Sequence, residues 1–212
     1  MRIVYLEGHL NVLEIWFERN VDINEIINES PIKVDKVYTY GNEKSVMGYH
    51  SSKFISLLTD LTVSEESLWT KLSKTTRQEI NRAKREDIRL LEIKNHEFYR
   101  NKEILKRFGD TYTHMYAQKG MNGIYLPMER ISAYIENKCF IITSAMIDGQ
   151  EAVYHSYIYD NHETRLLQSC SAFRGEDRTI KSKVSWANRY LHWNDMLMFK
   201  NAGLKRYDWG GV

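Results

Sequence analysis

Three basic side chains gather just before a helix that is predicted over residues 182–202. They are Arg174, Arg178 and Lys181. The first amides of a helix lack internal partners and lie at the positive end of the helix dipole, so an anion is stabilised there. This arrangement favours a ligand that carries phosphate. The alternative is a solvated loop, because Glu176 and Asp177 nearly balance the basic charge.

One histidine, His155, lies within a predicted strand among Tyr154, Tyr157 and Tyr159. Imidazole exchanges a proton near neutral pH, so it is the commonest general base in enzymes. A lone histidine on a strand is more often a structural residue whose hydrogen bonds are satisfied. The sequence therefore offers His155 as a candidate base, with a structural role as the alternative.

Six basic residues and one acid, Glu79, lie between Lys71 and Arg85. Their alternation with Thr and Gln is typical of the solvent-facing side of an amphipathic helix. The alternative is a surface that contacts the phosphates of transfer RNA or of a nucleotide-linked precursor. Binding that does not respond to salt would exclude the phosphate interpretation.

The composition of the 212 residues, with 42% hydrophobic and 27% charged residues and a net charge of +2, is that of an ordinary globular protein. No apolar run approaches the roughly 20 residues that span a bilayer. Glu7 and Glu14 interrupt the first apolar stretch, which argues against a secretory signal. Cys139 and Cys170 have no disulfide or metal-ligand pattern. We expect a cytoplasmic protein with reduced thiols and no metal site.

The helices and strands that would position these residues are hardest to predict in the first 60 residues. Strands are predicted at 2–5, 33–40 and 54–58, and a short helix at 12–19. Thr62 and Glu65 have the spacing of a capping box, in which a hydroxyl and a carboxylate satisfy the first helical amides. The apolar periodicity after them predicts one helix over 64–86, followed by a strand at 88–93.

The second half of the chain has a more regular pattern. Helices are predicted from Phe98 to Gly120 and over 129–137, and strands at 139–147, 152–159 and 164–171. Asp148-Gly149 supplies the positive-φ pair of a tight antiparallel hairpin. The helix at 182–202 and a strand at 205–209 follow. This order predicts an α/β (α+β) fold in which an antiparallel meander leads through a helix to a strand beside the same sheet.

Three segments resemble GNAT acyltransferases, and most closely the Fem aminoacyltransferases. Residues 66–87, ESLWTKLSKTTRQEINRAKRED, are similar to a Leu-Trp pair followed by Thr-Arg-x-x-Ile-x-x-Ala-x-Lys. Residues 190–212, YLHWNDMLMFKNAGLKRYDWGGV, resemble the Fem pattern that ends in Asp-aromatic-Gly-Gly, and 110–125 is similar too. The resemblance covers residues 55–212 and implies a GNAT-like mixed, largely antiparallel sheet flanked by helices. It also implies that residues 61–212 form the acyltransferase core, and we expect the strand-rich residues 1–60 to belong to the same unit.

Two departures from the family pattern affect the expected ligands and partners. Acyl-CoA enzymes usually carry an Arg/Gln-x-x-Gly-x-Gly/Ala loop before the long helix, whereas AFRGEDRTIKS has only Gly175. The resemblance therefore implies acyl-CoA or aminoacyl-tRNA as a co-substrate and no permanently bound cofactor. Family members also continue with further strands after Gly-Gly, where this chain ends at Val212. Two alternatives follow: the chain is shortened, or a partner completes the sheet at an open edge near 205–209, as a homodimer would.

Further candidate site residues follow from the resemblance. Asp208 matches the Asp of the Asp-aromatic-Gly-Gly pattern, and an acid there orients or deprotonates an acceptor amine. Its alternative role is to pair with Arg206 or to cap the next turn. In this fold the backbone amides of the strand before the long helix stabilise a developing oxyanion, which singles out Gln168, Ser169 and Cys170. The alternative is that these three are ordinary strand residues.

The resulting functional hypothesis is transfer of an acyl or aminoacyl group onto an amine of a cell-envelope or sugar precursor. The acceptor would be nucleotide- or lipid-linked. One alternative is a CoA-dependent N-acetyltransferase that acts on an amino sugar. Another is a module without catalysis that keeps the fold and binds a partner through the open sheet edge.

Overall fold

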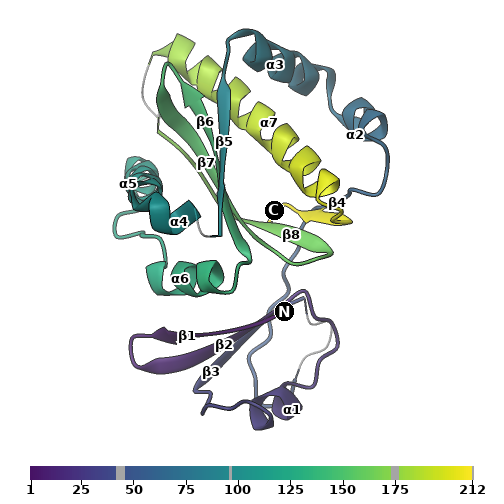
Figure 1. Ribbon diagram of the computed structural model, residues 1–212, viewed down its shortest axis with the longest axis vertical. Coiled ribbons are helices and arrows are strands. Elements are labelled where there is room, and N and C mark those ends of the chain that lie inside the picture. The colour runs from purple at the N-terminus through teal and green to yellow at the C-terminus, as the bar shows by residue number, and fades with distance from the viewer. Residues whose placement is uncertain (42–45, 96, 173–176, 212) are drawn as a thin grey trace.

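The strands of this chain form two sheets, of which the smaller lies below the larger in Figure 1. The structure, a computed structural model, describes residues 1–41, 46–95, 97–172 and 177–211. The smaller sheet has the order β1 (Arg2–Glu7), β2 (Leu10–Trp16), β3 (Lys36–Tyr40), with helix α1 (Ile23–Asn28) between the last two in the chain. The larger sheet has the order β4 (Leu58–Asp60), β9 (Arg206–Asp208), β8 (Glu163–Ser171), β7 (Gln150–Tyr159), β6 (Phe140–Ile147), β5 (Arg89–Lys94).

Helices cover both faces of the larger sheet (Figure 1). One face carries α7 (Arg178–Asn201), and α3 (Lys74–Arg85) packs against it after α2 (Glu65–Lys71). The other face carries α4 (Glu97–Arg100), α5 (Lys102–Gln118) and α6 (Met128–Glu136). All neighbouring strands of the larger sheet are antiparallel except β8 and β9. The predicted largely antiparallel sheet flanked by helices is therefore confirmed.

The predicted helix at 12–19 is wrong, because these residues form strand β2. Val12 to Trp16 are all buried, since β2 is the central strand of the smaller sheet and both of its faces are covered. Leu13 and Ile15 pack on the side of α1, whereas Trp16 joins the core beneath α6. A strand buried on both faces has no alternation of apolar and polar residues, so its sequence does not reveal its period.

The single helix predicted over 64–86 is two helices, α2 and α3, which meet at Leu72 and Ser73. Ser73 caps α3 by accepting a hydrogen bond from the amide of Thr76. Ser64, rather than Thr62, caps α2 through the amide of Ser67. A serine that caps an amide gives the backbone an alternative to the continuous helix, so the chain turns there.

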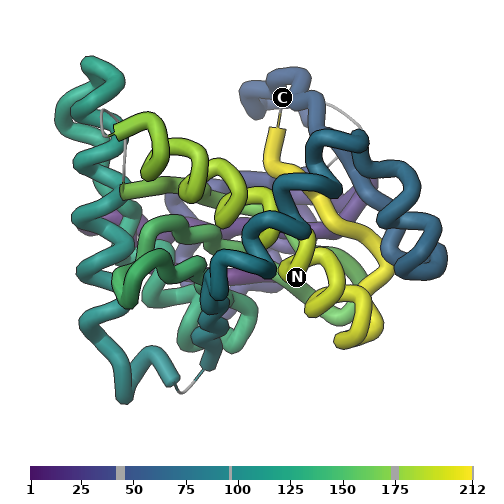
Figure 2. Tube along the Cα trace, turned by 90° about the horizontal axis from the view of Figure 1, so that it is seen from above, coloured from purple at the N-terminus to yellow at the C-terminus, as the bar shows by residue number. Residues whose placement is uncertain are grey.

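The strand predicted at 54–58 begins only at Leu58, and β4 covers the edge that was expected to stay open. Leu58, Thr59 and Asp60 pair antiparallel with β9. Figure 2 shows the yellow end of the chain alongside the blue segment that leads to β4. The expected bare edge at 205–209 is therefore wrong, since β4 and β5 are the outer strands of this sheet. The Asp148-Gly149 turn is as predicted, with φ of 52° and 83°.

Candidate functional site

Strand β9 ends after three residues that pair with β8, and we call the edge of β8 that lies beyond this pairing the seam. The parallel pairing joins only Glu163–Arg165 to Arg206–Asp208. Strand β8 continues to Ser171, but no described strand pairs with residues 166–171 on the side of β9. Main-chain groups on that edge of β8 are therefore not part of a sheet ladder. The amides that the family resemblance implies as oxyanion donors belong to this stretch of β8.

A bulge in β8 lies at the point where the seam begins. Ser156 pairs with Gln168 and Tyr157 pairs with Leu166, so Leu167 is an extra residue in β8. Leu167 packs on the α5 and α6 side of the sheet, and Gln168 accepts a hydrogen bond from Ser156. Bulges bend a strand and end its pairing, and they redirect side chains. The bulge therefore gives a structural reason why the β8–β9 pairing ends at Arg165.

Two glycines carry the chain past the mouth of the seam. Gly210 and Gly211 have φ of 84° and 118°, a region that side chains other than glycine rarely adopt. A Cβ atom on Gly210 would lie 2.3 Å from the carbonyl oxygen of Leu166, and one on Gly211 would lie 2.7 Å from the ring of Phe54. The Gly-Gly pair is thus required by backbone conformation and by close approach together.

Asp208 lies at the apex of the seam, on the last paired residue of β9. Its Oδ1 accepts hydrogen bonds from the hydroxyl of Ser56 and from the amide of Gly210, which lies 2.8 Å away. Its Oδ2 lies 3.8 Å from Nη1 of Arg165. Arg206 pairs with Glu163 instead, at 2.6 Å. Asp208 therefore caps the next turn, as the alternative interpretation proposed, while one of its oxygens remains available at the seam.

The other residues predicted around the donor lie on different sides of β8. Gln168 faces α5 and α6, Ser169 is exposed, and Cys170 is buried. Burial raises the pKa of the Cys170 thiol to about 12, so this sulfur is a neutral packing group near pH 7. These three side chains therefore do not meet in one place, and only the main chain of residues 168–170 follows the seam.

The predicted phosphate site at the start of α7 is only partly described. Arg174 lies outside the described residues, whereas Arg178 and Lys181 are exposed on the first turns of α7. Asp177 caps the helix, because its Oδ1 accepts a hydrogen bond from the amide of Thr179 at 2.5 Å. A carboxylate thus already occupies one amide that a phosphate would use. The phosphate site stays a prediction.

The basic run in α2 and α3 is mostly a solvent-facing surface. Arg77 is the exception, since its Nη1 donates to the carbonyl oxygens of Thr70 and Leu72 at 3.0 and 3.1 Å and joins the two helices. The other five basic residues are exposed. Lys84 lies over the rings of Trp69 and Tyr190, and Arg82 pairs with Glu86.

His155 is fully buried between the sheet and α7, within a polar network. Its Nδ1 lies 2.8 Å from Asp195 Oδ2 and its Nε2 lies 2.9 Å from Asn188 Oδ1. Tyr157 donates to the same Asp195 oxygen at 2.6 Å and contacts the hydroxyl of Tyr207 at 2.7 Å. With no exposed surface and both ring nitrogens occupied, His155 is placed to hold other groups rather than to touch a substrate.

His192 extends this network from α7 toward the seam. Its ring stacks on His155 at 3.9 Å, lies 5.0 Å from the ring of Trp209, and places Nδ1 3.3 Å from the hydroxyl of Tyr207. Burial and the neighbouring His155 and Arg189 lower the pKa of His192 well below its usual value, so the ring is neutral near pH 7. His155, His192 and Asp195 are of metal-binding types with ligand atoms within 4.8 Å, but hydrogen bonds account for both nitrogens of His155.

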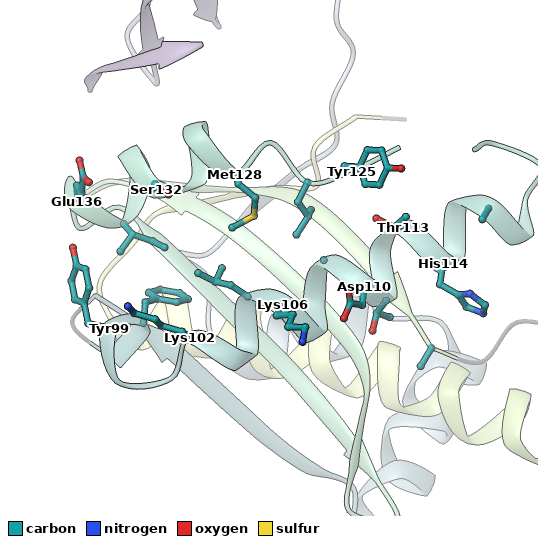
Figure 3. Close-up of a pocket in the computed structure, with 18 residues that line it drawn as sticks. Tyr99, Lys102, Lys106, Asp110, Thr113, His114, Tyr125, Met128, Ser132 and Glu136 are labelled. Carbon is teal, nitrogen blue, oxygen red and sulfur yellow. The ribbon is translucent and has the colours of Figure 1, made fainter. Parts of the chain in front are cut away.

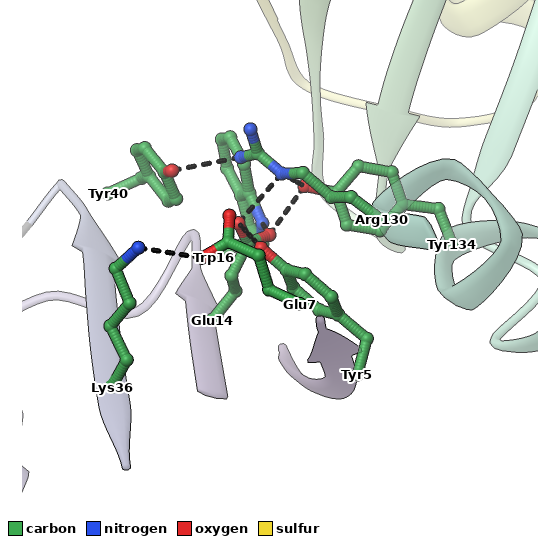
Figure 4. Close-up of polar contacts among 8 residues, drawn as sticks. All are labelled: Tyr5, Glu7, Glu14, Trp16, Lys36, Tyr40, Arg130 and Tyr134. Carbon is green, nitrogen blue, oxygen red and sulfur yellow. Dashed lines mark hydrogen bonds and ion pairs between the residues drawn. The ribbon is translucent and has the colours of Figure 1, made fainter. Parts of the chain in front are cut away.

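A second polar cluster joins the smaller sheet to α6, as Figure 4 shows. Glu14 on β2 is fully buried and accepts hydrogen bonds from Trp16 Nε1 at 2.8 Å and from the Tyr134 hydroxyl at 2.5 Å. Arg130 Nε lies 2.7 Å from Glu14 Oε1, and its Nη2 donates to the Tyr40 hydroxyl at 2.9 Å. These contacts join the smaller sheet to α6, and the assignment of residues 1–60 to the same unit stays a prediction.

A groove of about 1180 Å³ runs between α5 and α6, on the face of the larger sheet that these helices cover. Figure 3 shows Lys106, Asp110 and His114 along α5, with Met128 and Tyr125 across from them. Leucine, isoleucine, phenylalanine and alanine side chains form most of its apolar wall. The groove reaches Ala172, directly after the last residue of β8. It therefore offers space for a sizeable ligand next to the end of the strand that borders the seam.

The fold of the chain is similar to that of two solved structures. A structure of FemX aligns over 74% of this chain and 52% of its own, with a TM-score of 0.59 and 10% identity. The C-terminal domain of a putative lysylphosphatidylglycerol synthetase from Agrobacterium fabrum aligns over 74% of this chain and 46% of its own, with a TM-score of 0.54 and 13% identity. The chain thus spans about half the length of these proteins. No protein family and no curated protein matches it in sequence.

Several residues at the seam were not predicted from the sequence. Arg165, Ser56 and Phe54 lie around Asp208, yet they come from segments that the sequence predicted only as strands. Glu14 was noted only because it interrupts an apolar stretch, although a buried acid between apolar residues indicates a buried polar partner.

No described helix is both long and apolar enough to cross a membrane.

Proposed function

We propose that this chain transfers an acyl or aminoacyl group onto an amine at the seam of β8. The observation that carries the proposal is the early end of the β8–β9 pairing, which leaves the edge of residues 166–171 without a strand partner. Backbone amides fixed in a sheet are preorganised donors for the oxyanion that forms during acyl transfer. The fold shared with FemX supports this class of reaction.

In the proposed reaction the amine nitrogen attacks the carbonyl carbon of the donor, and the bond from that carbon to the donor's oxygen or sulfur breaks. The proton leaves the nitrogen for the carboxylate of Asp208 and can then pass to the leaving group. Asp208 suits this role because hydrogen bonds fix its Oδ1 and leave Oδ2 at the apex of the seam. The acceptor would be an amine of a nucleotide- or lipid-linked envelope or sugar precursor, with the α5–α6 groove holding its larger part.

Transfer assays with labelled aminoacyl-tRNA and, separately, labelled acetyl-CoA test the proposal and identify the donor. The acceptors would be nucleotide-linked amino sugars and envelope peptide precursors. Asp208→Asn is expected to lower turnover by at least about 100-fold, the usual size of a general-base contribution. Asp148→Asn is the matched control, because Asp148 lies in an exposed hairpin turn that asparagine also adopts. Full activity of Asp208→Asn would exclude this site.

The second candidate is a module that binds a partner without catalysis. The outer strand β4 favours it, because Leu58 and the preceding Ile55 and Leu57 are exposed apolar residues beside an open strand edge. A chain that stays monomeric and transfers label from either donor would exclude this candidate. Tight binding of CoA measured by calorimetry would favour the amino-sugar N-acetyltransferase over transfer from tRNA.

A further inference from the structure

Arg165 is the last residue of β8 that pairs with β9, directly opposite Asp208. Its side chain is only 13% exposed. The guanidinium carbon lies 4.4 Å from the ring centre of Phe54, 5.5 Å from that of Trp16 and 5.9 Å from that of Tyr40. Aromatic rings from two distant parts of the chain thus hold a cation at the apex of the seam.

The guanidinium of Arg165 makes no hydrogen bond to any residue that the structure describes. Its only carboxylate neighbour there is Asp208, and 3.8 Å is too long for a hydrogen bond. Other half-buried arginines differ, since Arg130 lies 2.7 Å from Glu14 and Arg206 lies 2.6 Å from Glu163. Arginine carries five N–H donors, and buried charged groups are normally paired. The donors of Arg165 therefore remain available to a ligand.

Stacking against aromatic rings leaves the edge of a guanidinium free, and that edge binds carboxylate or phosphate through two parallel hydrogen bonds. The ring contacts of Arg165 are of this kind, and its described carboxylate neighbour, Asp208, lies beyond hydrogen-bond distance. Trp16 and Tyr40 stack on each other at 3.8 Å, whereas Phe54 is 59% exposed. The stacked pair restricts the guanidinium before any ligand arrives, which lowers the entropy cost of binding.

We propose that Arg165 binds an oxyanion, a carboxylate or a phosphate, of a molecule that enters the seam. The neighbouring carboxylate of Asp208 repels a doubly charged phosphate more than a carboxylate. It also attracts an ammonium group. The pair therefore favours a ligand that carries a carboxylate and an amine on the same or adjacent carbons, as an amino acid does. This binding does not require that transfer occurs, so it stands apart from the proposed function.

Nuclear magnetic resonance of the whole chain, labelled with ¹⁵N-arginine and ¹⁵N-tryptophan, tests the proposal. The probes are glycine, N-acetylglycine, glycinamide and inorganic phosphate. We expect glycine to shift the Arg165 Nε and Trp16 Nε1 signals saturably and N-acetylglycine to do so with lower affinity. Glycinamide, which lacks the carboxylate, should leave both signals in place. Arg165→Lys assigns the arginine signal and keeps the positive charge.

Arg165→Gln should weaken glycine binding at least tenfold, which is the size of one charge-assisted hydrogen bond. Arg206→Gln is the matched control on the neighbouring strand and should bind as the unaltered chain does, since Arg206 is already paired with Glu163. Saturable shifts with phosphate alone would keep the oxyanion site and remove the selection of carboxylate. Unmoved Arg165 signals with every probe, or full affinity in Arg165→Gln, would overturn the proposal. Failed transfer assays with these shifts present would count only against the transferase.

Discussion

Two aspartates beside the end of the larger sheet have opposite surroundings. Asp195 on α7 is fully buried, and its Oδ2 lies 2.8 Å from His155 and 2.6 Å from the hydroxyl of Tyr157. Asp208 on β9 has a side chain that is 14% exposed, and its cationic neighbour, Arg165, stays 3.8 Å away. The first aspartate is part of a buried network that uses its Oδ2 and leaves its Oδ1 without a described hydrogen-bond partner, whereas the second faces a cation whose donors make no hydrogen bond to a described residue.

This difference separates structure from function more clearly than residue type does. A histidine hydrogen-bonded to an aspartate is a familiar catalytic pair, yet here it lies where no substrate can reach it. Polar groups that satisfy one another in the interior fix one packing of the core. Polar groups left without partners at an opening are available to a ligand. We therefore propose chemistry at Asp208 and structural support at Asp195.

Asp195→Ala should have the largest effect on stability. The change removes the shared acceptor of His155 and Tyr157 in a fully buried site, which costs about 3 kcal/mol or more of unfolding free energy. Urea unfolding measures the loss. A cost below about 1 kcal/mol would show that the network does not hold the core, and the contrast between the two aspartates would fail.

Gly210→Ala should come next, because it tests the close contact that shapes the seam. Alanine at this positive φ would also force its Cβ against the carbonyl oxygen of Leu166, so we expect a loss above about 2 kcal/mol. Gly203→Ala is the matched control, since Gly203 has φ of 89° but nothing within 4 Å of the added atom. The control should lose only about 1 kcal/mol from backbone strain. Equal losses would mean that Gly210 does not approach β8 closely.

The regular elements of the second half could be predicted from the sequence because their patterns are local. The turn at Asp148-Gly149 and the strands on both sides of it need only neighbouring residues to specify them. Strand β2 was missed because partners on both faces, far along the chain, make every one of its residues from Val12 to Trp16 buried.

The seam shows the same limit for the candidate site. Asp208 was predicted because it lies within a recognisable local pattern, whereas Arg165 lies 43 positions earlier, in a strand that looked ordinary. Phe54 and Trp16 reach Arg165 from the first third of the chain. A binding group assembled from three distant segments leaves no spacing in the sequence, so only the fold reveals it.

His192 gives the network of Asp195 a measurable pH dependence. The folded chain lowers the pKa of this ring, so below the ordinary value of about 6.5 the unfolded chain takes up a proton that the folded chain does not. The free energy of unfolding should therefore fall as the pH drops from 7 to 5, by up to about 1.4 kcal/mol per pH unit from this group. His192→Asn should flatten that slope, whereas His162→Asn, at an exposed loop residue, should not. Identical slopes in all three proteins would show that His192 is not held neutral.

Asp208→Asn should change stability least, and that small effect is the sharpest test of the comparison. Asparagine can still accept the hydrogen bonds of Ser56 and of the Gly210 amide through its carbonyl oxygen. The lost attraction to Arg165 acts over 3.8 Å at a partly exposed site, so the cost should stay below about 1 kcal/mol. A residue whose charge contributes little to folding but whose removal abolishes transfer acts on the substrate. A loss in urea unfolding as large as that of Asp195→Ala would instead make Asp208 a second structural aspartate and leave the seam without its proposed base.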